Sequence, residues 1–225
     1  MIIDPSKLDR RERSGLVNGL VAPRPIAWVS SLAPDGTRNL APFSFFGAFS
    51  FDPPTIGLAP GSRRGVNKDS LRNIKATGEF VVNLVDRSLA EIVNASSAEF
   101  APDVDEWDVI GVQGIASEVV APMRVAQAPA ALECRVRQVL ELGDAERSSN
   151  NLVVAWIVRI HVVDEAMNGL NPDPDVLDLV GRMGGDEWCT MRDRFTLRRP
   201  DSNDAAEVQA LLERRHDDKQ EVPQR

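Results

Sequence analysis

The chain has 225 residues, of which 43% are hydrophobic, so it can bury a substantial core as a single domain. Its formal net charge of −8 argues against nucleic acid and anionic lipid as partners, and no apolar run approaches the length of a membrane span. The two cysteines lie far apart in sequence, which fits a reducing compartment, and the N-terminal residues lack the apolar region of a secretory signal. We therefore expect a cytoplasmic protein that binds neither nucleic acid nor membrane.

The first quarter of the chain predicts short strands separated by turns. Residues 26–32 are β-rich and lead into Asp35-Gly36, a hairpin signal whose partner strand is expected over residues 38–46. Two adjacent prolines exclude a helix at residues 53–54 and precede a short apolar strand over residues 55–59.

A helix is predicted from Asp69 through Ala76. Asp69 can serve as its N-cap, and Gly78 stands where a C-terminal stop is expected. A strand over residues 80–85 and a second helix over residues 88–95 should follow.

The second half of the chain predicts further strands. Residues 112–120 are expected to be extended, and residues 152–163 are apolar enough to predict a strand covered on both sides over most of its length. Between them runs the clearest alternation in the sequence, with Leu132, Cys134, Val136, Leu140 and Leu142 on one face and Glu133, Arg135, Arg137 and Glu141 on the other. This pattern is typical of a half-solvated antiparallel strand.

Many strands, few helices and no βαβ alternation favour a barrel or a sandwich over a doubly wound sheet. We expect residues 1–200 to form one mainly β domain and residues 201–225 to form a charged tail. Apolar residues at helical spacing, Ala205, Val208, Leu211 and Leu212, leave two readings of this tail open: a short helix packed on a partner, or a frayed end.

An aromatic segment follows the first hairpin. Five of the eight phenylalanines lie between Phe43 and Phe51, and most are expected in the core, with one as a candidate wall for a ligand. Gly47 within this segment favours a bulge or kink.

Small polar side chains gather around the same hairpin. Ser30, Ser31 and Ser44 carry hydroxyl groups, and the segment Leu40-Ala41-Pro42 has compact side chains that a ring edge could approach. The alternative is an ordinary strand that bears serines for local hydrogen bonds.

Lys68-Asp69-Ser70 opens the first predicted helix. A lysine before a helix start adds a positive charge where the first-turn N–H groups already favour an anion, and Arg63 and Arg64 stand just upstream. Residues 1–75 also carry 11 basic against 6 acidic side chains, in contrast with the acidic remainder. The sequence therefore indicates a phosphate site here, with a capped surface helix as the alternative.

Other enzyme classes lack their signatures. His161 and His216 are the only histidines, and the chain has no G-x-S-x-G motif, no Walker loop and no G-x-G-x-x-G opening a helix after a strand. Metal-dependent and hydrolase readings are thereby disfavoured, and no catalytic side chain is assigned.

The spaced segments RPIAWVSS, NLAPFSFF, DPPTIGLAP, NKDSLRNIKATGEFVVNLV, APAALECRV and GRMGGDEWCTMRDRFTLRRP resemble the flavin reductase-like, FMN-binding split-barrel family over about residues 1–200. The resemblance implies an antiparallel Greek-key split β-barrel with peripheral helices, FMN as cofactor, and a homodimer with the site at or near its interface. Its cofactor-binding roles, together with the hydroxyl groups noted above, fall on Ser30, Ser31, Asn39, Leu40, Ala41, Pro42, Ser44, Lys68, Asp69, Ser70 and Arg182.

Within that set, the resemblance places the isoalloxazine along residues 39–44 and the phosphate near Lys68, Asp69 and Ser70. Because Asp69 is negative, capping the helix or holding a ribityl hydroxyl suits it better than meeting the phosphate. Asn94 to Ser97 could add polar contacts, although a helix cap is their simpler role. Trp188 stands where a tyrosine is expected in relatives.

The activity that the resemblance implies is NAD(P)H-dependent flavin reduction, in which hydride passes from nicotinamide C4 to flavin N5, with NADH or NADPH as donor and a separate monooxygenase as a partner that could receive reduced flavin. Two alternatives stay open. One is a flavoredoxin-like FMN electron carrier, and the other is a different oxidoreductase on the same barrel, reducing a small organic substrate or oxidising a pyridoxal-type phosphate.

Overall fold

The computed structural model describes residues 1–63, 66–98, 100, 105–142, 150–197, 199 and 208–209. Its contacts divide the chain into two units, Met1–Arg192 and Asp193–Arg225. Most of the tail, including Ala205, Leu211 and Leu212, lies outside the described residues, so the domain boundary at residue 200 and the two alternatives for the tail, a packed helix or a frayed end, stay predictions. No described helix is long and apolar enough to cross a membrane.

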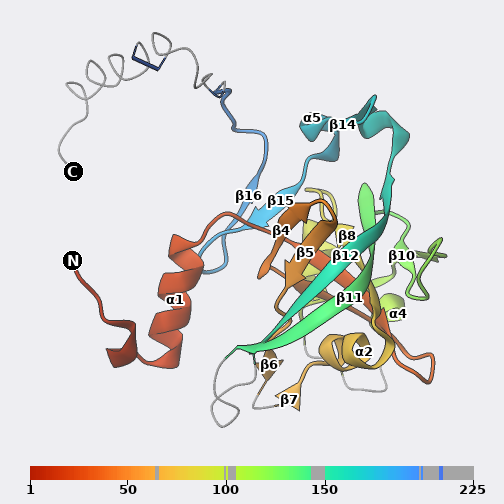
Figure 1. The fold of residues 1–225 in the computed structure, drawn as a ribbon, viewed down its shortest axis with the longest axis horizontal. Coiled ribbons are helices and arrows are strands. Elements are labelled where there is room, and N and C mark those ends of the chain that lie inside the picture. Colours follow the sequence, from red (N-terminus) through yellow and green to blue (C-terminus); the bar gives the residue numbers. More distant parts are fainter. Residues whose placement is uncertain are drawn as a thin grey trace. The chain divides into compact units, whose positions relative to one another are not determined.

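A seven-stranded antiparallel sheet dominates the first unit, in the order β3-β2-β8-β11-β12-β5-β4. Its strands are β2 (Ala27–Leu32), β3 (Arg38–Phe43), β4 (Phe46–Phe51), β5 (Pro54–Leu58), β8 (Glu79–Leu84), β11 (Ala130–Leu142) and β12 (Asn150–Val162). The long β11–β12 hairpin runs through the centre of this order (Figure 1). The expected mainly β, antiparallel fold with few helices is therefore confirmed.

Short elements surround the large sheet, and β1, β15 and β16 form a separate three-stranded sheet. The helices are η1 (Pro5–Lys7), α1 (Arg10–Leu20), α2 (Asp69–Thr77), α3 (Ala90–Ala95), α4 (Glu106–Ile110), η2 (Asp164–Ala166) and α5 (Pro174–Leu177). The remaining strands are β1 (Arg24–Pro25), β6 (Ser62–Arg63), β7 (Val66–Asn67), β9 (Gly114–Ile115), β10 (Arg124–Val125), β13 (Met167–Asn168), β14 (Asn171–Pro172), β15 (Val180–Arg182) and β16 (Trp188–Thr190).

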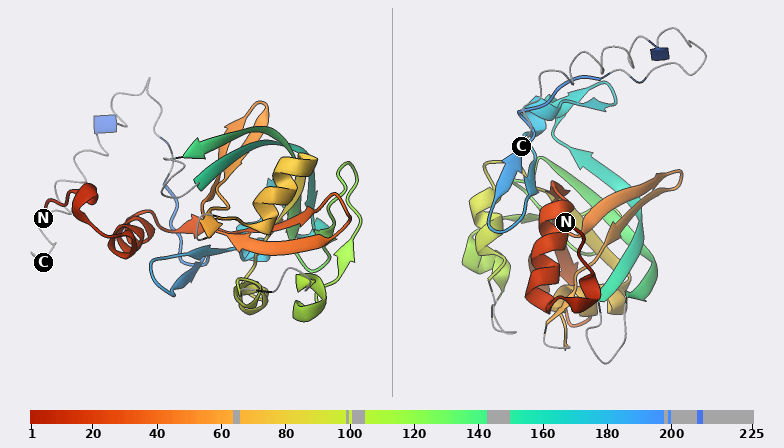
Figure 2. Two further views of the ribbon diagram at one scale, coloured as in Figure 1. Left: turned by 90° about the horizontal axis from the view of Figure 1, so that it is seen from below. Right: turned by 90° about the vertical axis from the view of Figure 1, so that its left-hand side faces the viewer.

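Strand β2 is buried on both faces and separates two parts of the core. Ala27 and Val29 face a cluster formed with β8 and β11, to which α2 contributes Leu71 and Ile74. Trp28 faces a second cluster beneath α3 and α4. Figure 2 shows α2 lying along the strands of the first hairpin, as its packing on β2 requires.

The N-cap of helix α2 stands one residue earlier than the sequence predicts. Its N-cap is Lys68, which makes no capping side-chain hydrogen bond, and Asp69 is the first helical residue, so the predicted Asp69 cap is wrong. The Asp69 carboxylate pairs instead with Arg72 on the next turn. The predicted stop is confirmed, because Gly78 ends the helix with a left-handed φ of 73°.

The first hairpin forms as predicted, with Leu32 paired to Arg38, but its second strand ends at Phe43 rather than at residue 46. The chain then bends, and Phe46 opens β4, which pairs with β5 instead. The second helix also starts later than expected, at Ala90.

Residues 112–120 are not an extended strand, apart from the two residues of β9. The N–H groups of Glu118, Val119 and Val120 donate to the Glu133 carboxylate at 2.7, 2.7 and 3.1 Å. Because these donors are taken by a side chain, they are not available to a strand ladder.

Glu133 was predicted to face solvent and is instead fully buried. Besides the three N–H groups, it contacts Nε2 of His161 at 2.6 Å. Burial raises the pKa of Glu133, but the N–H donors and His161 outweigh burial and hold that pKa below its ordinary value. A register shift between Glu133 and Cys134 and another between Val136 and Gln138 break the expected alternation, so that Leu140 and Leu142 are exposed.

Strand β12 is not covered on both sides within this chain. Trp156 is 41% exposed and Ile160 is 57% exposed. The strand therefore alternates between core-facing and outward-facing residues, as an antiparallel strand at the surface does.

The expectation that most of the clustered phenylalanines lie in the core is also wrong. Phe43 is buried, whereas Phe45, Phe49 and Phe51 are 51%, 71% and 94% exposed. Phe49 and Phe51 lie on β4, the edge strand of the sheet, which has a neighbouring strand on one side only, and Phe45 comes just before it. The predicted irregularity occurs two residues after Gly47, as a register shift between Ala48 and Ser50.

Arg24 joins the end of α1 to the small sheet. The side chain is 7% exposed, and its guanidinium donates to the carbonyl oxygens of Asn18 and Val21 and, at 2.9 Å, to that of Met183. Burial, together with nearby Arg182, lowers the pKa of Arg24. Three carbonyl groups from two backbone segments, the end of α1 and the residue after β15, therefore accept from one buried cation.

Candidate functional site

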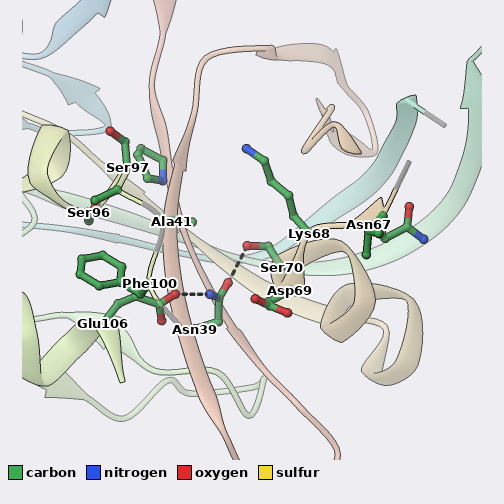
Figure 3. Close-up of a pocket in the computed structure, with 13 residues that line it drawn as sticks. Asn39, Ala41, Asn67, Lys68, Asp69, Ser70, Ser96, Ser97, Phe100 and Glu106 are labelled. Carbon is green, nitrogen blue, oxygen red and sulfur yellow. Dashed lines mark hydrogen bonds between the residues drawn. The ribbon is translucent and has the colours of Figure 1, made fainter. Parts of the chain in front are cut away.

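A cavity of about 320 Å³ opens where the first hairpin, α2 and the segment around α4 meet (Figure 3). This volume suits a small-molecule ligand. Its lining residues are Asn39, Ala41 and Pro42 from β3, Val66, Asn67, Lys68, Asp69 and Ser70 from β7 and the start of α2, and Ser96, Ser97, Ala98, Phe100 and Glu106 from α3 to α4.

The alternation of β3 decides which of its side chains reach this first cavity. Asn39 and Ala41 point to the cavity, whereas Leu40 points away and is fully buried in the second core cluster. Pro42 also lines the cavity and has no N–H to donate. The strand therefore presents one amide and two compact apolar side chains.

One end of the first cavity favours an anion. The first turn of α2 lies there with no side-chain cap, so its N–H groups and the positive end of its dipole are open to a ligand. The Lys68 ammonium lies 5.1 Å from the centre of the Phe43 ring, which keeps this charge beside the same helix start.

The other end of the first cavity is acidic. The Glu106 carboxylate accepts from the Asn39 side-chain amide at 2.7 Å and from the Leu40 N–H at 3.4 Å. Burial raises the pKa of Glu106 despite these hydrogen bonds, and the negative charge of Asp69 acts in the same direction. The cavity is therefore polarised, with a cationic end and a carboxylate end.

The ion pair between Arg38 and Asp105 holds helix α4 against β3. Asp105 is the N-cap of α4 and accepts from the Trp107 N–H at 2.9 Å, while its other oxygen accepts from Nε of Arg38 at 2.8 Å. Arg38 and Asn39 are consecutive on β3, as Asp105 and Glu106 are on α4. The ion pair thus fixes the neighbouring Glu106 against Asn39.

A second, smaller cavity of about 130 Å³ shares Pro42 and Ser97 with the first. Its other lining residues are Ile26, Phe43, Ser44, Val93, Asn94, Arg182 and Trp188, so it is more apolar. The Arg182 guanidinium lies 5.2 Å from the centre of a Trp188 ring and donates to the Gly185 carbonyl at 2.8 Å.

A third cavity of about 330 Å³ continues from the second. Both are lined by Asn94 and Trp188, and the third adds Arg87, Cys189 and Thr190. The three cavities therefore form a row that passes from the start of α2 to the small sheet.

Most residues predicted for the site are brought together by the fold. Asn39, Ala41, Pro42, Lys68, Asp69 and Ser70 line the first cavity, and Pro42, Ser44 and Arg182 line the second. Segments that lie far apart in sequence thus meet along two adjoining cavities.

Three predicted residues are not brought to the described cavities. The Ser30 hydroxyl is buried and donates to the Met123 carbonyl at 2.5 Å, and Leu40 lies in the core. Ser31 is buried too, where it accepts from Asn73 at 3.2 Å. Arg64 lies outside the described residues.

Sequence reasoning missed Glu106 and Phe100. Ser97 does cap α3, because its hydroxyl donates to the Asn94 carbonyl at 2.6 Å, and it also lines two cavities. Glu106 stands 67 residues from Asn39, so no local spacing links them. The acidic run from Asp105 to Asp108 signals a helix start and nothing more specific.

A mainly β, antiparallel sheet whose first hairpin and helix start enclose a polarised cavity is the architecture of a split-barrel protein that binds a small molecule. The family model "Flavin reductase like domain" matches residues 20–176. A protein of Deinococcus radiodurans is 40% identical over 202 residues, which cover 87% of this chain and 88% of that protein. The chain therefore belongs to the flavin reductase-like domain family.

Solved structures support the same conclusion. Nitrilotriacetate monooxygenase component B from Bacillus cereus is 29% identical with a TM-score of 0.84, covering 88% of this chain and 98% of that one. The 2-nitrobenzoate 2-nitroreductase NbaA of Pseudomonas fluorescens is 30% identical with a TM-score of 0.81, covering 90% and 98%. A Shewanella frigidimarina protein with a split barrel domain shares the fold at 21% identity, with a TM-score of 0.76 over 87% and 96% of the two chains.

Proposed function

We propose that the protein is an FMN-binding oxidoreductase that reduces flavin with NADH or NADPH. The observation that carries this proposal is the polarised first cavity, which joins an apolar second cavity at Pro42. A phosphorylated molecule with an aromatic ring needs both environments side by side.

The residues present fit FMN. The uncapped first turn of α2 and the Lys68 ammonium would hold the phosphate, because both supply positive potential at one end of the cavity. Ala41 and Pro42 would face the ring, since their compact side chains permit close approach, and Ser44 would contact its edge. Arg182 lies beside the second cavity, where a cation stabilises negative charge on a reduced ring.

Bound FMN would supply the redox chemistry, taking up a hydride at N5 from C4 of a nicotinamide. The role of the protein would be to align FMN with the nicotinamide and to exclude water. Phe43 and Trp188 wall the second cavity with apolar surface, and Asn94 contributes a polar group there. The third cavity, which shares Trp188, offers room for the hydride donor.

We further propose a homodimer. Phe45, Phe49 and Phe51 on the edge of the large sheet and Trp156 and Ile160 on β12 are exposed in the single chain. Exposed apolar side chains of this size mark an interaction surface. A single monomer mass in light scattering would contradict the dimer.

Two further points of biological context belong to the proposal. The similarity to a monooxygenase component B supports a separate monooxygenase as recipient of reduced flavin. Both cysteines are free thiols, which supports a reducing compartment such as the cytoplasm.

A second candidate is reduction of a nitroaromatic acid by the bound flavin. The similarity to NbaA favours it, and Arg182 and Trp188 together offer a cation and an aromatic face for an aromatic carboxylate. A flavoredoxin-like carrier is the remaining alternative, since flavoredoxin from Methanosarcina acetivorans shares the fold at 17% identity and a TM-score of 0.71.

Anaerobic absorbance spectra of the FMN-loaded protein test the proposal. Bleaching by NADH or NADPH alone supports the reductase, and turnover of 2-nitrobenzoate after bleaching supports the second candidate. Bleaching only by dithionite or by a partner protein would support the flavoredoxin-like electron carrier instead. A protein that binds no flavin would contradict all three.

A further inference from the structure

A chain of hydrogen bonds crosses the floor of the first cavity from α4 to α2 (Figure 3). The Asn39 side-chain amide donates to Oε1 of Glu106 at 2.7 Å, and its carbonyl oxygen accepts from the Ser70 hydroxyl at 2.5 Å. Asn39 and Ser70 are 7% and 1% exposed. Three separate elements, α4, β3 and α2, therefore share one polar network.

The carboxylate sets the direction of every bond in this network. An ionised Glu106 can only accept, so the NH₂ group of Asn39 must face it and the amide oxygen must face Ser70. A serine hydroxyl can donate only one hydrogen bond, and Ser70 donates it to the amide oxygen of Asn39. Ser70 therefore has only lone pairs left for a ligand.

We propose that Glu106 is a positioning residue which, acting through Asn39, makes Ser70 a hydrogen-bond acceptor and so reserves this end of the cavity for a hydroxyl-bearing part of the ligand. This inference rests on the proposed function. It goes beyond it by assigning which part of a flavin lies here: the ribityl hydroxyls, which can donate, and not the phosphate, whose oxygens accept.

The charges around this end agree with the assignment. Asp69 and Glu106 both line the cavity beside Ser70, and their two carboxylates repel a phosphate, which leaves only the Lys68 side of the α2 start for that group. The Lys68 ammonium instead lies by the Phe43 ring, on the far side of Ser70 from Glu106 in the view of Figure 3. The ligand would therefore lie with its phosphate toward Lys68 and its hydroxyls toward Glu106.

The accepting role of Ser70 is opposite to the one that its place beside the phosphate site suggests. A serine at a helix start commonly donates to an anion. If Ser70 did so here, its removal would weaken binding only of ligands that carry a phosphate. If it accepts from a hydroxyl, its removal would weaken binding of FMN and riboflavin alike.

The test is a fluorescence titration of FMN and riboflavin against wild type, Ser70→Ala, Glu106→Gln and the double variant. We expect Ser70→Ala to weaken both flavins by a similar factor of about tenfold, the loss typical of a hydrogen bond in a polar network. Glu106→Gln should weaken riboflavin comparably, because a glutamine no longer fixes the orientation of Asn39. The double variant should bind riboflavin no more weakly than Ser70→Ala alone, since both changes remove one interaction.

Glu118→Gln is the matched control, because it removes the same charge from an exposed position that lines none of the three cavities. Its affinities should equal those of the wild type. Melting temperatures of the ligand-free variants confirm that each is folded, and Ser70→Ala decides the matter alone if Glu106→Gln does not fold.

A loss confined to FMN in Ser70→Ala, wild-type riboflavin affinity in Glu106→Gln, or losses that multiply in the double variant would overturn the inference and leave the proposed function standing. A wild-type protein that binds neither flavin would overturn both. The two failures are therefore distinguishable.

Discussion

The guanidinium of Arg38 donates to the Asp105 carboxylate from Nε at 2.8 Å and from Nη2 at 2.5 Å, across 67 residues of chain. The same carboxylate caps α4, so one aspartate holds both the start of the helix and its place on β3. The next residue on each element, Asn39 and Glu106, forms the acidic end of the first cavity. The shape of the candidate site thus depends on a contact just outside it.

Replacing Asp105 by alanine should therefore lower stability and flavin affinity together. Loss of the cap and of the Arg38 pair predicts a decrease of about 1–2 kcal/mol in the free energy of unfolding. Urea denaturation measures this change. Asp108→Ala is the control, because its side chain is 79% exposed and caps nothing, so an equal loss there would contradict the role given to Asp105.

Lys68→Ala should weaken FMN binding by about 1–3 kcal/mol through loss of a charged contact to the phosphate. Riboflavin, which has no phosphate, should bind the variant as it binds the wild type. Isothermal titration with both flavins checks this. Lys75→Ala removes an exposed charge from the same helix and should change neither affinity; unchanged FMN affinity in Lys68→Ala would remove Lys68 from the site.

Glu133→Gln should destabilise the fold at neutral pH by about 1–3 kcal/mol, because the buried carboxylate accepts three N–H bonds and contacts His161. The folded-state pKa of Glu133 lies below its ordinary value of 4.5. Its contribution is therefore fully present above the unfolded-state pKa and disappears as the pH falls through the folded-state value.

Urea denaturation of wild type and Glu133→Gln at neutral pH and in the acid range measures this dependence. The difference between them should shrink in acid. A difference that is constant across this range would show that the charge of Glu133 has no part in stability.

The two thiols should differ in reactivity. Cys134 is fully buried, and burial raises its thiol pKa far above the ordinary value, so the reactive thiolate is absent near neutral pH. Cys189 is partly exposed beside the third cavity. Iodoacetamide followed by mass spectrometry should label Cys189 alone in the native protein and both residues in urea; native labelling of Cys134 would contradict its burial.

Local signals predicted the strands and helices well where the sequence pattern and the packing agree. The Asp-Gly hairpin, the stop at Gly78 and the β8 strand follow from turn chemistry and apolar periodicity, which act over a few residues. The pattern failed at Glu133 because a bulge rotates the strand and distant N–H groups compensate the buried charge. It failed at Phe49 because exposure depends on being at a sheet edge, which the sequence does not specify.

For the candidate site, the sequence identified the cationic end and not the acidic one. Lys68 and Ser70 stand beside a helix start, so their proximity to an anion site follows from local structure. The partnership of Asn39 with Glu106 arises only when α4 folds onto β3. Ser30 is a candidate from its residue type alone, and in the structure its hydroxyl donates to the Met123 carbonyl instead of facing a cavity.

The N-terminal helix α1 has no buried side chain, yet the end of this helix supplies carbonyl groups that hold the buried guanidinium of Arg24. Two of its backbone acceptors, Asn18 and Val21, belong to that helix or to the residue after it, and its Nε lies 3.4 Å from the Ser44 hydroxyl beside the second cavity. Shortening the chain to begin at Ala22 would strand a positive charge inside the protein with Met183 as its remaining carbonyl partner. Removing this peripheral helix would therefore also disturb Arg24, and through it Ser44 in the wall of the second cavity.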